Sequence, residues 1–237
     1  MAPPRATARQ RPSPLSDPQQ IAREKQAAAA AAAELVEGGM RVGLGTGTTV
    51  AHLLPAIAAR GLSGLRCVAT SPATERAARE LGLTVEALDE VGELDVAIDG
   101  ADQIDPQGWL VKGGGGAHTR EKIVAACARR FVVIASAEKA VQRLAPPVPL
   151  ELLRFGVHRT LSALAPARLR EGAPTSPDGG LIADYLGPIE GPGALAARLS
   201  QTPGLVEHGL FAPEMVSLIL IAGPQGVQRR AGAKSQR

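Results

Sequence analysis

Residues 41–60, Arg-Val-Gly-Leu-Gly-Thr-Gly-Thr-Thr-Val-Ala-His-Leu-Leu-Pro-Ala-Ile-Ala-Ala-Arg, decide the fold class of this 237-residue chain. Arg41–Leu44 is a short apolar run that predicts a buried strand, and the glycines and threonines of residues 45–49 predict a loop. Residues 48–60 then predict a helix, with Pro55 at a kink or a boundary. A strand, a glycine-rich loop and a helix in this order are typical of an α/β protein.

The alternation of strands and helices continues on both sides of this unit. Residues 18–37 predict a helix with an alanine-rich centre, ended by Gly38-Gly39. Downstream we expect strands at 65–70, 84–88, 94–98 and 131–135, and helices at 71–81 and 121–130. We therefore expect a mostly parallel sheet with helices on both faces, and the carboxyl ends of its strands at one edge.

The character of the chain changes after Lys139. Three prolines between residues 146 and 149 mark a break. The segment 145–212 then contains candidate strands at 150–153, 181–184 and 206–210, and candidate helices at 159–169 and 193–199. We interpret it as a smaller α+β domain. Residues 216–222 are a strong strand candidate that returns to the main sheet, so the main domain comprises residues 18–144 and 213–223.

Both ends of the chain are basic. Residues 1–16 and 224–237 together hold seven of the 26 basic residues and no acid, which leaves 19 basic against 23 acidic residues in the body. The formal charge of +3 is thus a property of the ends. We expect a disordered basic tail over residues 1–17, a basic tail over residues 224–237, and no nucleic-acid-binding face.

The composition argues against several other classes of protein. Only five residues are aromatic, so stacking platforms for single-stranded nucleic acid are few. The longest strongly apolar stretch, residues 216–222, is too short to span a membrane. Cys67 and Cys127 lie in apolar contexts, where we expect buried free thiols, and no Cys/His cluster suggests a metal site. The proline-rich N-terminus opposes a transit helix, so we expect a cytoplasmic protein.

The first of three polar loops is Gly43-Leu44-Gly45-Thr46-Gly47-Thr48-Thr49. Backbone N–H groups at a helix N-terminus attract anions and threonine hydroxyls add donors, so this loop suits a phosphate group. The dinucleotide fingerprint G-x-G-x-x-G is broken, because Thr48 or Val50 stands at its last glycine. A plain strand-to-helix turn is the alternative interpretation.

The second loop, Asp99-Gly100-Ala101-Asp102, follows the predicted strand 94–98. Carboxylates at the end of a strand can face a pocket at the sheet edge, where they bind sugar hydroxyls or move protons between oxygens. A metal site and an Asx-type turn are the alternatives, although no histidine lies nearby to support the metal.

The third loop is Lys112-Gly113-Gly114-Gly115-Gly116-Ala117-His118-Thr119-Arg120-Glu121. Glycines let a backbone approach a ligand closely, and here they bring a lysine and a glutamate toward one small volume. Proton transfer next to a carbonyl needs such a base, and positive charge where the oxygen becomes anionic. The alternative is a flexible surface loop, with Glu121 complementing a helix dipole. Lys139, after the strand 131–135, is either a ligand for an anionic substrate or a solvated lysine.

In their order and spacing, these loops resemble those of the type A ribose-5-phosphate isomerase family. The resemblance continues through Arg120-Glu121-Lys122, Asp178-Gly179-Gly180-Leu181 and residues 203–211, and it covers roughly residues 18–223. It implies a Rossmann-like α/β domain with a smaller α+β domain, assembled as a homodimer or homotetramer. It also implies interconversion of D-ribose 5-phosphate and D-ribulose 5-phosphate through an enediolate, in the non-oxidative pentose phosphate pathway, without metal or organic cofactor.

Carried over position by position, the resemblance implies a role for each loop. Glu121 would move the proton between C2 and C1, Asp99 would assist ring opening and proton movement between the oxygens, and Lys112 would stabilise the enediolate. Asp102 would help hold the sugar. The substrate-binding residues would be Thr46, Gly47, Thr48, Thr49, Asp99, Gly100, Ala101, Asp102, Lys112, Gly113, Gly114, Gly115 and Lys139, and Lys25 stands where the family often has a lysine near the phosphate.

Three positions depart from the family pattern. Gln103 replaces the acid that commonly follows Gly-Ala-Asp, His118 stands at a usually apolar place, and Thr48 stands where serine is common. None of them removes a catalytic group. Gln103 and His118 can change the local charge and therefore the pH dependence.

Two other classes of function compete with an isomerase. A non-catalytic sugar-phosphate sensor would have the same fold, but binding alone does not need the base that Glu121 supplies. A nicotinamide dehydrogenase would need the dinucleotide fingerprint that this chain lacks.

Overall fold

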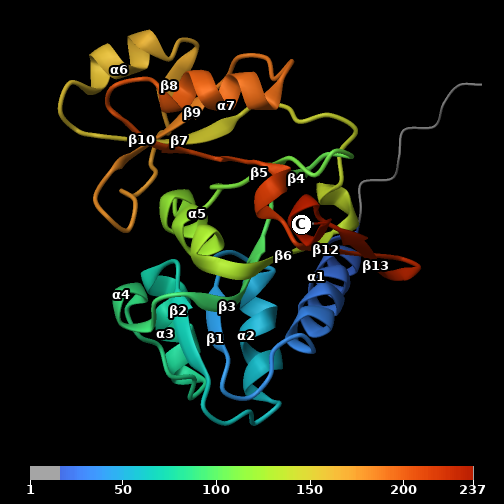
Figure 1. Cartoon of the computed structure of the whole chain (residues 1–237). Coiled ribbons are helices and arrows are strands. Elements are labelled where there is room, and N and C mark those ends of the chain that lie inside the picture. Colours follow the sequence, from blue (N-terminus) through green and yellow to red (C-terminus); the bar gives the residue numbers. More distant parts are fainter. Residues whose placement is uncertain (1–16, 237) are drawn as a thin grey trace, which may run out of the picture.

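The computed structural model describes residues 17–236, and its centre is a six-stranded sheet of order β13-β12-β6-β3-β1-β2 (Figure 1). The strands are β1 (Arg41–Leu44), β2 (Arg66–Ala69), β3 (Leu94–Gly100), β6 (Ala128–Ser136), β12 (Leu218–Gly223) and β13 (Gly226–Ala231). All neighbouring pairs are parallel except β12 and β13. The mostly parallel sheet is confirmed, and so is the return of the chain to it near residue 218.

Helices cover both faces of this sheet. Alternate strand residues such as Leu44 and Ile98 are fully buried against α1 and α2, whereas Ala97 and Val133 pack with α5 on the other face. Each large apolar side chain buried in this way contributes about 1.5–3 kcal/mol. The helices are α1 (Pro18–Ala33), α2 (Val50–Ala58), α3 (Pro72–Glu80), α4 (Leu88–Val91), α5 (His118–Cys127), α6 (Val157–Ala163) and α7 (Pro192–Ser200), with short 3₁₀ turns η1 (Ala137–Lys139), η2 (Pro213–Met215) and η3 (Ala233–Gln236).

A second, antiparallel sheet of order β10-β7-β9-β8 lies with α6 and α7 at the other end of the molecule (Figure 1). Its strands are β7 (Val148–Leu152), β8 (Ala167–Leu169), β9 (Leu181–Tyr185) and β10 (Leu205–His208). It has its own core, which includes the fully buried Leu150, Leu164 and Leu199. A smaller α+β part is therefore present, while the boundaries at residues 145 and 212 stay a prediction.

A third sheet of three short strands stands between the other two. Its order is β11-β5-β4, formed by Leu210–Phe211, Leu110–Val111 and Gln103–Ile104. Since β5 immediately precedes the glycine loop, this small sheet sets where that loop leaves the body of the protein.

Several predicted element boundaries are wrong for identifiable reasons. The helix predicted to begin at residue 121 begins at His118, where contacts with the second sheet hold its first turn. The helix expected over residues 159–169 ends at Ala163, because Pro166 cannot continue it, and the chain forms β8 instead. Residues 84–88 make only an isolated bridge between Val85 and Cys67.

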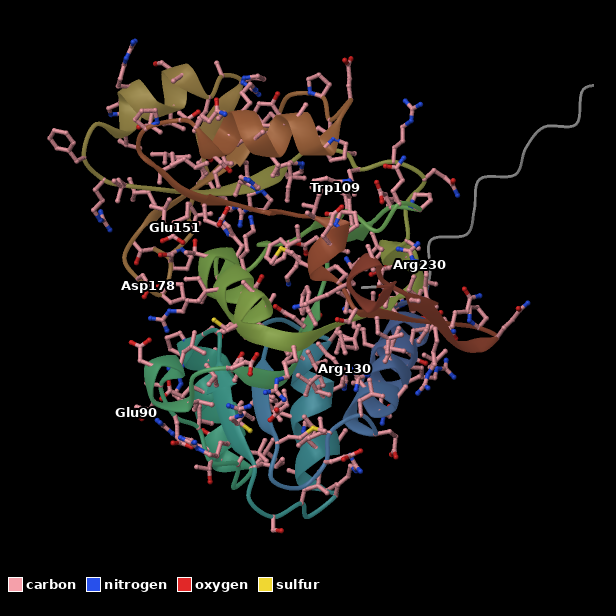
Figure 2. The ribbon with its side chains drawn as sticks, in the orientation of Figure 1. Glu90, Trp109, Arg130, Glu151, Asp178 and Arg230 are labelled. Carbon is pink, nitrogen blue, oxygen red and sulfur yellow. The ribbon has the colours of Figure 1, made fainter. Side chains whose placement is uncertain are left out.

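The expected basic tail over residues 224–237 is also wrong for the residues described. The chain turns through Pro224-Gln225, and β13 pairs with β12 along its whole length. Arg230, labelled in Figure 2, donates to the Asp105 carbonyl at 2.9 Å, and Lys234 donates to the Ala128 carbonyl at 2.6 Å. Because β13 is a largely exposed edge strand, it lacks the apolar alternation that marks a strand in a sequence. Most of the predicted N-terminal tail lies outside the described residues.

Neither thiol is paired. Cys67 is buried and burial raises its pKa to about 11, while Cys127 is half-buried. Within residues 17–236, none of the helices is both long enough and apolar enough to cross a membrane.

Removing β13 tests its contribution to the fold. A chain that ends at Gly223 exposes the apolar edge of β12 and loses the Arg230 and Lys234 contacts. We expect a loss of roughly 2–4 kcal/mol and a melting temperature about 5–15 °C lower, measured by circular dichroism. Arg229→Ser, at an exposed position of β13, should keep the wild-type melting temperature. If the truncated chain is as stable as the full chain, β13 does not contribute to the stability of the fold.

Candidate active site

The three polar loops meet at the carboxyl edge of the main sheet. β1 lies between β2 and β3, so the connections after β1 and β3 leave toward opposite sides and open a crevice between them. The glycine loop after β5 closes the third side. One pocket is lined by all of the predicted site residues except Asp99, together with Lys25: Lys25, Thr46, Gly47, Thr48, Thr49, Gly100, Ala101, Asp102, Lys112, Gly113, Gly114, Gly115, Glu121 and Lys139.

The floor of the pocket holds an ammonium between two carboxylates. Lys112 Nζ lies 2.9 Å from Asp99 Oδ2 and 3.0 Å from Glu121 Oε2, and it donates to the Gly100 carbonyl at 2.6 Å. The three side chains are only 3–4% exposed. Lys112 lies just after β5, Asp99 lies in β3 and Glu121 in the first turn of α5, so this triad joins three separate elements.

Asp99 lies beneath the pocket surface because the first loop closes over it. Its Oδ1 accepts the N–H of Thr46 at 3.0 Å and the N–H of Gly100 at 2.7 Å. A Cβ on Gly45 would stand 2.0 Å from Asp99 Oδ1, so only glycine fits there. The first loop therefore orients the carboxylate as well as lining the pocket.

Burial and mutual charge tune the triad. The pKa of Glu121 is raised to about 7, first by burial and then by the charge of Asp99, while Lys112 opposes the shift. Burial also raises the pKa of Asp99. Burial by itself would lower the pKa of Lys112, but the two carboxylates outweigh it and raise that pKa, so Lys112 is a permanent cation. A carboxyl that titrates near neutrality, beside a fixed cation, is suited to acid–base catalysis.

The opposite end of the pocket is suited to an anion. Lys25 of α1 donates to Thr48 Oγ1 at 2.9 Å, and Lys139 follows from η1. Of the groups that the structure describes, the N–H groups of Gly47, Thr48 and Thr49 donate to no protein acceptor. They precede α2, where helix-terminal N–H groups favour negative charge. Thr46 contributes less to anion binding than the sequence predicted, because its hydroxyl is hydrogen-bonded to Thr70 and its N–H to Asp99.

The glycine loop is held from two directions. On one side Asp102 Oδ2 accepts the Gly114 N–H at 2.9 Å. On the other side Arg170, just after β8, donates to the Gly114 carbonyl at 2.9 Å and to the Gly113 carbonyl at 3.3 Å. Gly113 has φ of +104°, which favours glycine. No pattern in the sequence pointed to Arg170, because it lies in a region predicted to follow a helix.

The first turn of α5 is attached to the second sheet. Thr119 donates to the buried carboxylate of Glu151 in β7, which also accepts the Ser176 hydroxyl. Next to it, Arg120 forms a two-pronged ion pair with Asp178, at 2.8 and 2.6 Å. Glu151 and Asp178 both lie beside α5 in Figure 2. These contacts fix the turn that carries Glu121.

The unusual residues of the chain leave the charge of the pocket unchanged. Burial lowers the pKa of His118 to about 4, so this ring is neutral, and its Nε2 lies 3.3 Å from the Glu207 carbonyl. Gln103 exchanges two hydrogen bonds with the backbone of Ala145 and does not line the pocket. The departures at 103 and 118 thus keep the local electrostatics intact.

Fold and site together define a class of enzyme: a Rossmann-like α/β protein that moves protons on a small anionic substrate. Comparison with known proteins gives the family. The family model described as Ribose 5-phosphate isomerase A (phosphoriboisomerase A) matches residues 66–226. The relative in Roseiflexus sp. is 49% identical over 218 residues, 86% of this chain and 93% of that protein. The one in Caulobacter vibrioides is 46% identical over 220 residues, 87% and 96% of the two chains.

Solved structures agree with the sequence relatives. Ribose 5-phosphate isomerase A from Neisseria gonorrhoeae has a TM-score of 0.85 at 31% identity, covering 89% of this chain and 97% of that one. A D-ribose-5-phosphate isomerase in complex with phospho-erythronic acid has a TM-score of 0.84 at 32% identity, with 89% and 99% covered. The chain belongs to the ribose 5-phosphate isomerase A family.

The contact between the first loop and Asp99 can be tested with one methyl group. Gly45→Ala places its Cβ against Asp99 Oδ1 and must displace either the loop or the carboxylate. We expect kcat/KM for ribose 5-phosphate to fall by about 100-fold or more, since shifts of about 1 Å at an active site have this effect. Gly191→Ala is the matched control, because its nearest neighbour is 3.9 Å from the added Cβ. Wild-type activity in Gly45→Ala would contradict the described packing.

Proposed function

We propose that Glu121 is the general base of this enzyme and that Lys112 stabilises its intermediate. The reaction follows from family membership: the chain is an aldose–ketose isomerase that interconverts D-ribose 5-phosphate and D-ribulose 5-phosphate, a step of the pentose phosphate pathway. The observation that carries the assignment is the buried ammonium of Lys112, 3.0 Å from Glu121 and 2.9 Å from Asp99.

The chemistry requires one base that acts on two adjacent carbons. In the open-chain substrate C1 is an aldehyde and C2 carries a hydroxyl. The Glu121 carboxylate takes the C2 hydrogen as a proton, and the electron pair left behind forms an enediolate across C1 and C2. Transfer of the O2 hydroxyl proton to O1, and return of the proton from Glu121 to C1, then give a hydroxyl group on C1 and the ketone at C2. A carboxyl group whose pKa is about 7 can both accept and return that proton at neutral pH.

The pocket contains positive charge and free N–H groups that can bind the enediolate oxygens. Lys112 is a fixed cation on the floor of the pocket. Among the described residues, the N–H groups of Gly113 and Gly115 donate to no protein acceptor, and both glycines line the pocket. Donors placed in advance where charge develops lower the barrier more than donors that must reorganise.

Asp99 and Asp102 have different roles in this proposal. Asp99 is buried below the pocket, so its oxygens act mainly through Lys112 and through the pKa of Glu121. Its part in ring opening stays a prediction from the family resemblance. Asp102 lines the pocket and keeps one oxygen beyond its bond to Gly114, which suits a sugar hydroxyl.

The phosphate of the substrate belongs at the end formed by the first loop, Lys25 and Lys139. Free N–H groups at residues 47–49 and two ammonium groups give this end positive potential. The complex of a solved relative with phospho-erythronic acid, a phosphorylated sugar acid, supports a ligand of this kind.

A sensor that only binds sugar phosphate is a weaker explanation of the same site. Burying two carboxylates and an ammonium costs several kcal/mol per ion before their attraction is counted. Binding of a phosphorylated sugar needs neither a buried base nor a raised pKa. Two other properties, a homodimeric or homotetrameric state and a cytoplasmic location, remain predictions; light scattering after gel filtration tests the first.

Replacing the base gives the direct test. We expect Glu121→Gln to lower kcat by at least about 10²–10⁴-fold, because one positioned base contributes this much. Exchange of the C2 hydrogen in heavy water, followed by NMR, should disappear together with turnover, while calorimetry still detects substrate binding. Glu80→Gln, at an exposed position of α3, is the matched control. Near-normal exchange in Glu121→Gln would remove Glu121 from the mechanism.

The pH profile tests the tuning of the base. Since the carboxylate form is required, kcat/KM should rise as the pH increases through about 7 and level off above it. Asp99 raises the pKa of Glu121, so Asp99→Asn should move this rise to lower pH in addition to reducing the rate. A rise at unchanged pH in the variant would show that Asp99 does not set the pKa of Glu121.

A further inference from the structure

We propose that Arg170 is a positioning residue that holds the glycine loop, residues 112–116, in its catalytic geometry. The inference rests on the proposed function, because it concerns the loop that presents Lys112 and two free N–H groups. Arg170 does not line the pocket, so it acts through the loop and touches no substrate.

The guanidinium group of Arg170 bridges two parts of the protein. Nε and Nη2 bind the two oxygens of Asp184 in β9, at 2.9 and 2.6 Å. Nη1 donates to the carbonyls of Gly113 and Gly114. The side chains of Arg170 and Asp184 are 23% and 15% exposed, so the bridge is largely shielded from water. A charge-assisted bond of this kind is stronger than a neutral one.

The loop needs such a bridge because its own sequence does not fix its shape. Glycine has more backbone freedom to lose than any other residue, and four of them follow one another here. Inside the loop one turn bond joins the Gly116 N–H to the Gly113 carbonyl at 3.0 Å. Asp102 holds the Gly114 N–H. Arg170 holds the Gly113 carbonyl of that same peptide, and also the Gly114 carbonyl, which shares its peptide with the Gly115 N–H. The two contacts together fix these two peptide planes, and so the direction of the free Gly115 N–H.

The contact depends on shape as well as on charge. A planar guanidinium can bind a carboxylate with one edge and carbonyl oxygens with another, whereas a lysine ammonium is a single point of charge. Lysine at position 170 could satisfy Asp184 or the loop, but not both in this geometry. Arg170→Lys should therefore be nearly as damaging as Arg170→Met.

The experiment compares Arg170→Met, Arg170→Lys and Arg170→Ala with the wild type. We expect kcat to fall by about 10–100-fold in each, with a smaller rise in KM, because the loop acts most strongly on the charge of the transition state. Hydrogen exchange measured by mass spectrometry should become faster in the peptide that contains residues 113–116. Millimolar guanidinium should restore part of the kcat of Arg170→Ala. Arg159→Met, an exposed arginine of α6, is the control and should match the wild type.

Each outcome separates a positioning role from a structural one. Loss of melting temperature with unchanged kcat per folded molecule, or no rescue by guanidinium, would overturn the proposal. If the Arg170 variants fail to fold, Asp184→Asn provides the second test, because it frees the guanidinium from its anchor and should lower kcat in the same way. Wild-type kcat in a folded Asp184→Asn would likewise overturn it.

The control for the proposed function is independent. If Glu121→Gln loses turnover while the Arg170 variants keep it, the base assignment stands and the Arg170 inference fails. If Glu121→Gln keeps turnover, the base assignment itself fails, whatever the Arg170 variants do.

Discussion

The ammonium of Lys112, held between the carboxylates of Asp99 and Glu121, is the contact around which the polar loops are organised. Three charges lie out of water here, and such an arrangement is stable only when the remaining lone pairs and protons find partners. The N–H groups of Thr46 and Gly100 provide them for Asp99, and the carbonyl of Gly100 provides one for Lys112. One negative charge remains in excess, and burial together with this excess keeps the proton affinity of Glu121 high enough to be useful at neutral pH.

The sheet allows this cluster of buried charges to form because its members come from separate elements. The crevice between β1 and β3 exists because the connections after these strands leave the sheet in opposite directions. It is therefore a result of the topology and does not depend on small side chains. Asp99 enters from a strand, Glu121 from a helix and Lys112 from the end of a strand in the small three-stranded sheet. Rigid elements on all sides limit how far any of the three groups can move in response to its neighbours.

Much of this arrangement could be predicted from the sequence. The buried strands are apolar runs, and glycines and acids at their ends identified the loops that line the pocket. The features that were predicted wrongly or missed depend on contacts between segments that are distant in the sequence. β13 forms because β12 offers it an edge, and α5 begins at His118 because Glu151 and Asp178 hold its first turn. Arg170 has a partner only after β8 and β9 have paired, so no local pattern could mark it.

The attachments of α5 and of the glycine loop to the second sheet have a consequence for how such proteins can diverge. Three separate polar contacts cross the boundary between the two parts: Thr119 with Glu151, Arg120 with Asp178, and the Gly114 carbonyl with Arg170. A chimaera that joins the main sheet of one relative to the second sheet of another takes one partner of every contact from each relative. Recombination at this boundary is therefore constrained to exchange both halves together, and the two parts are expected to evolve as one unit rather than as interchangeable modules.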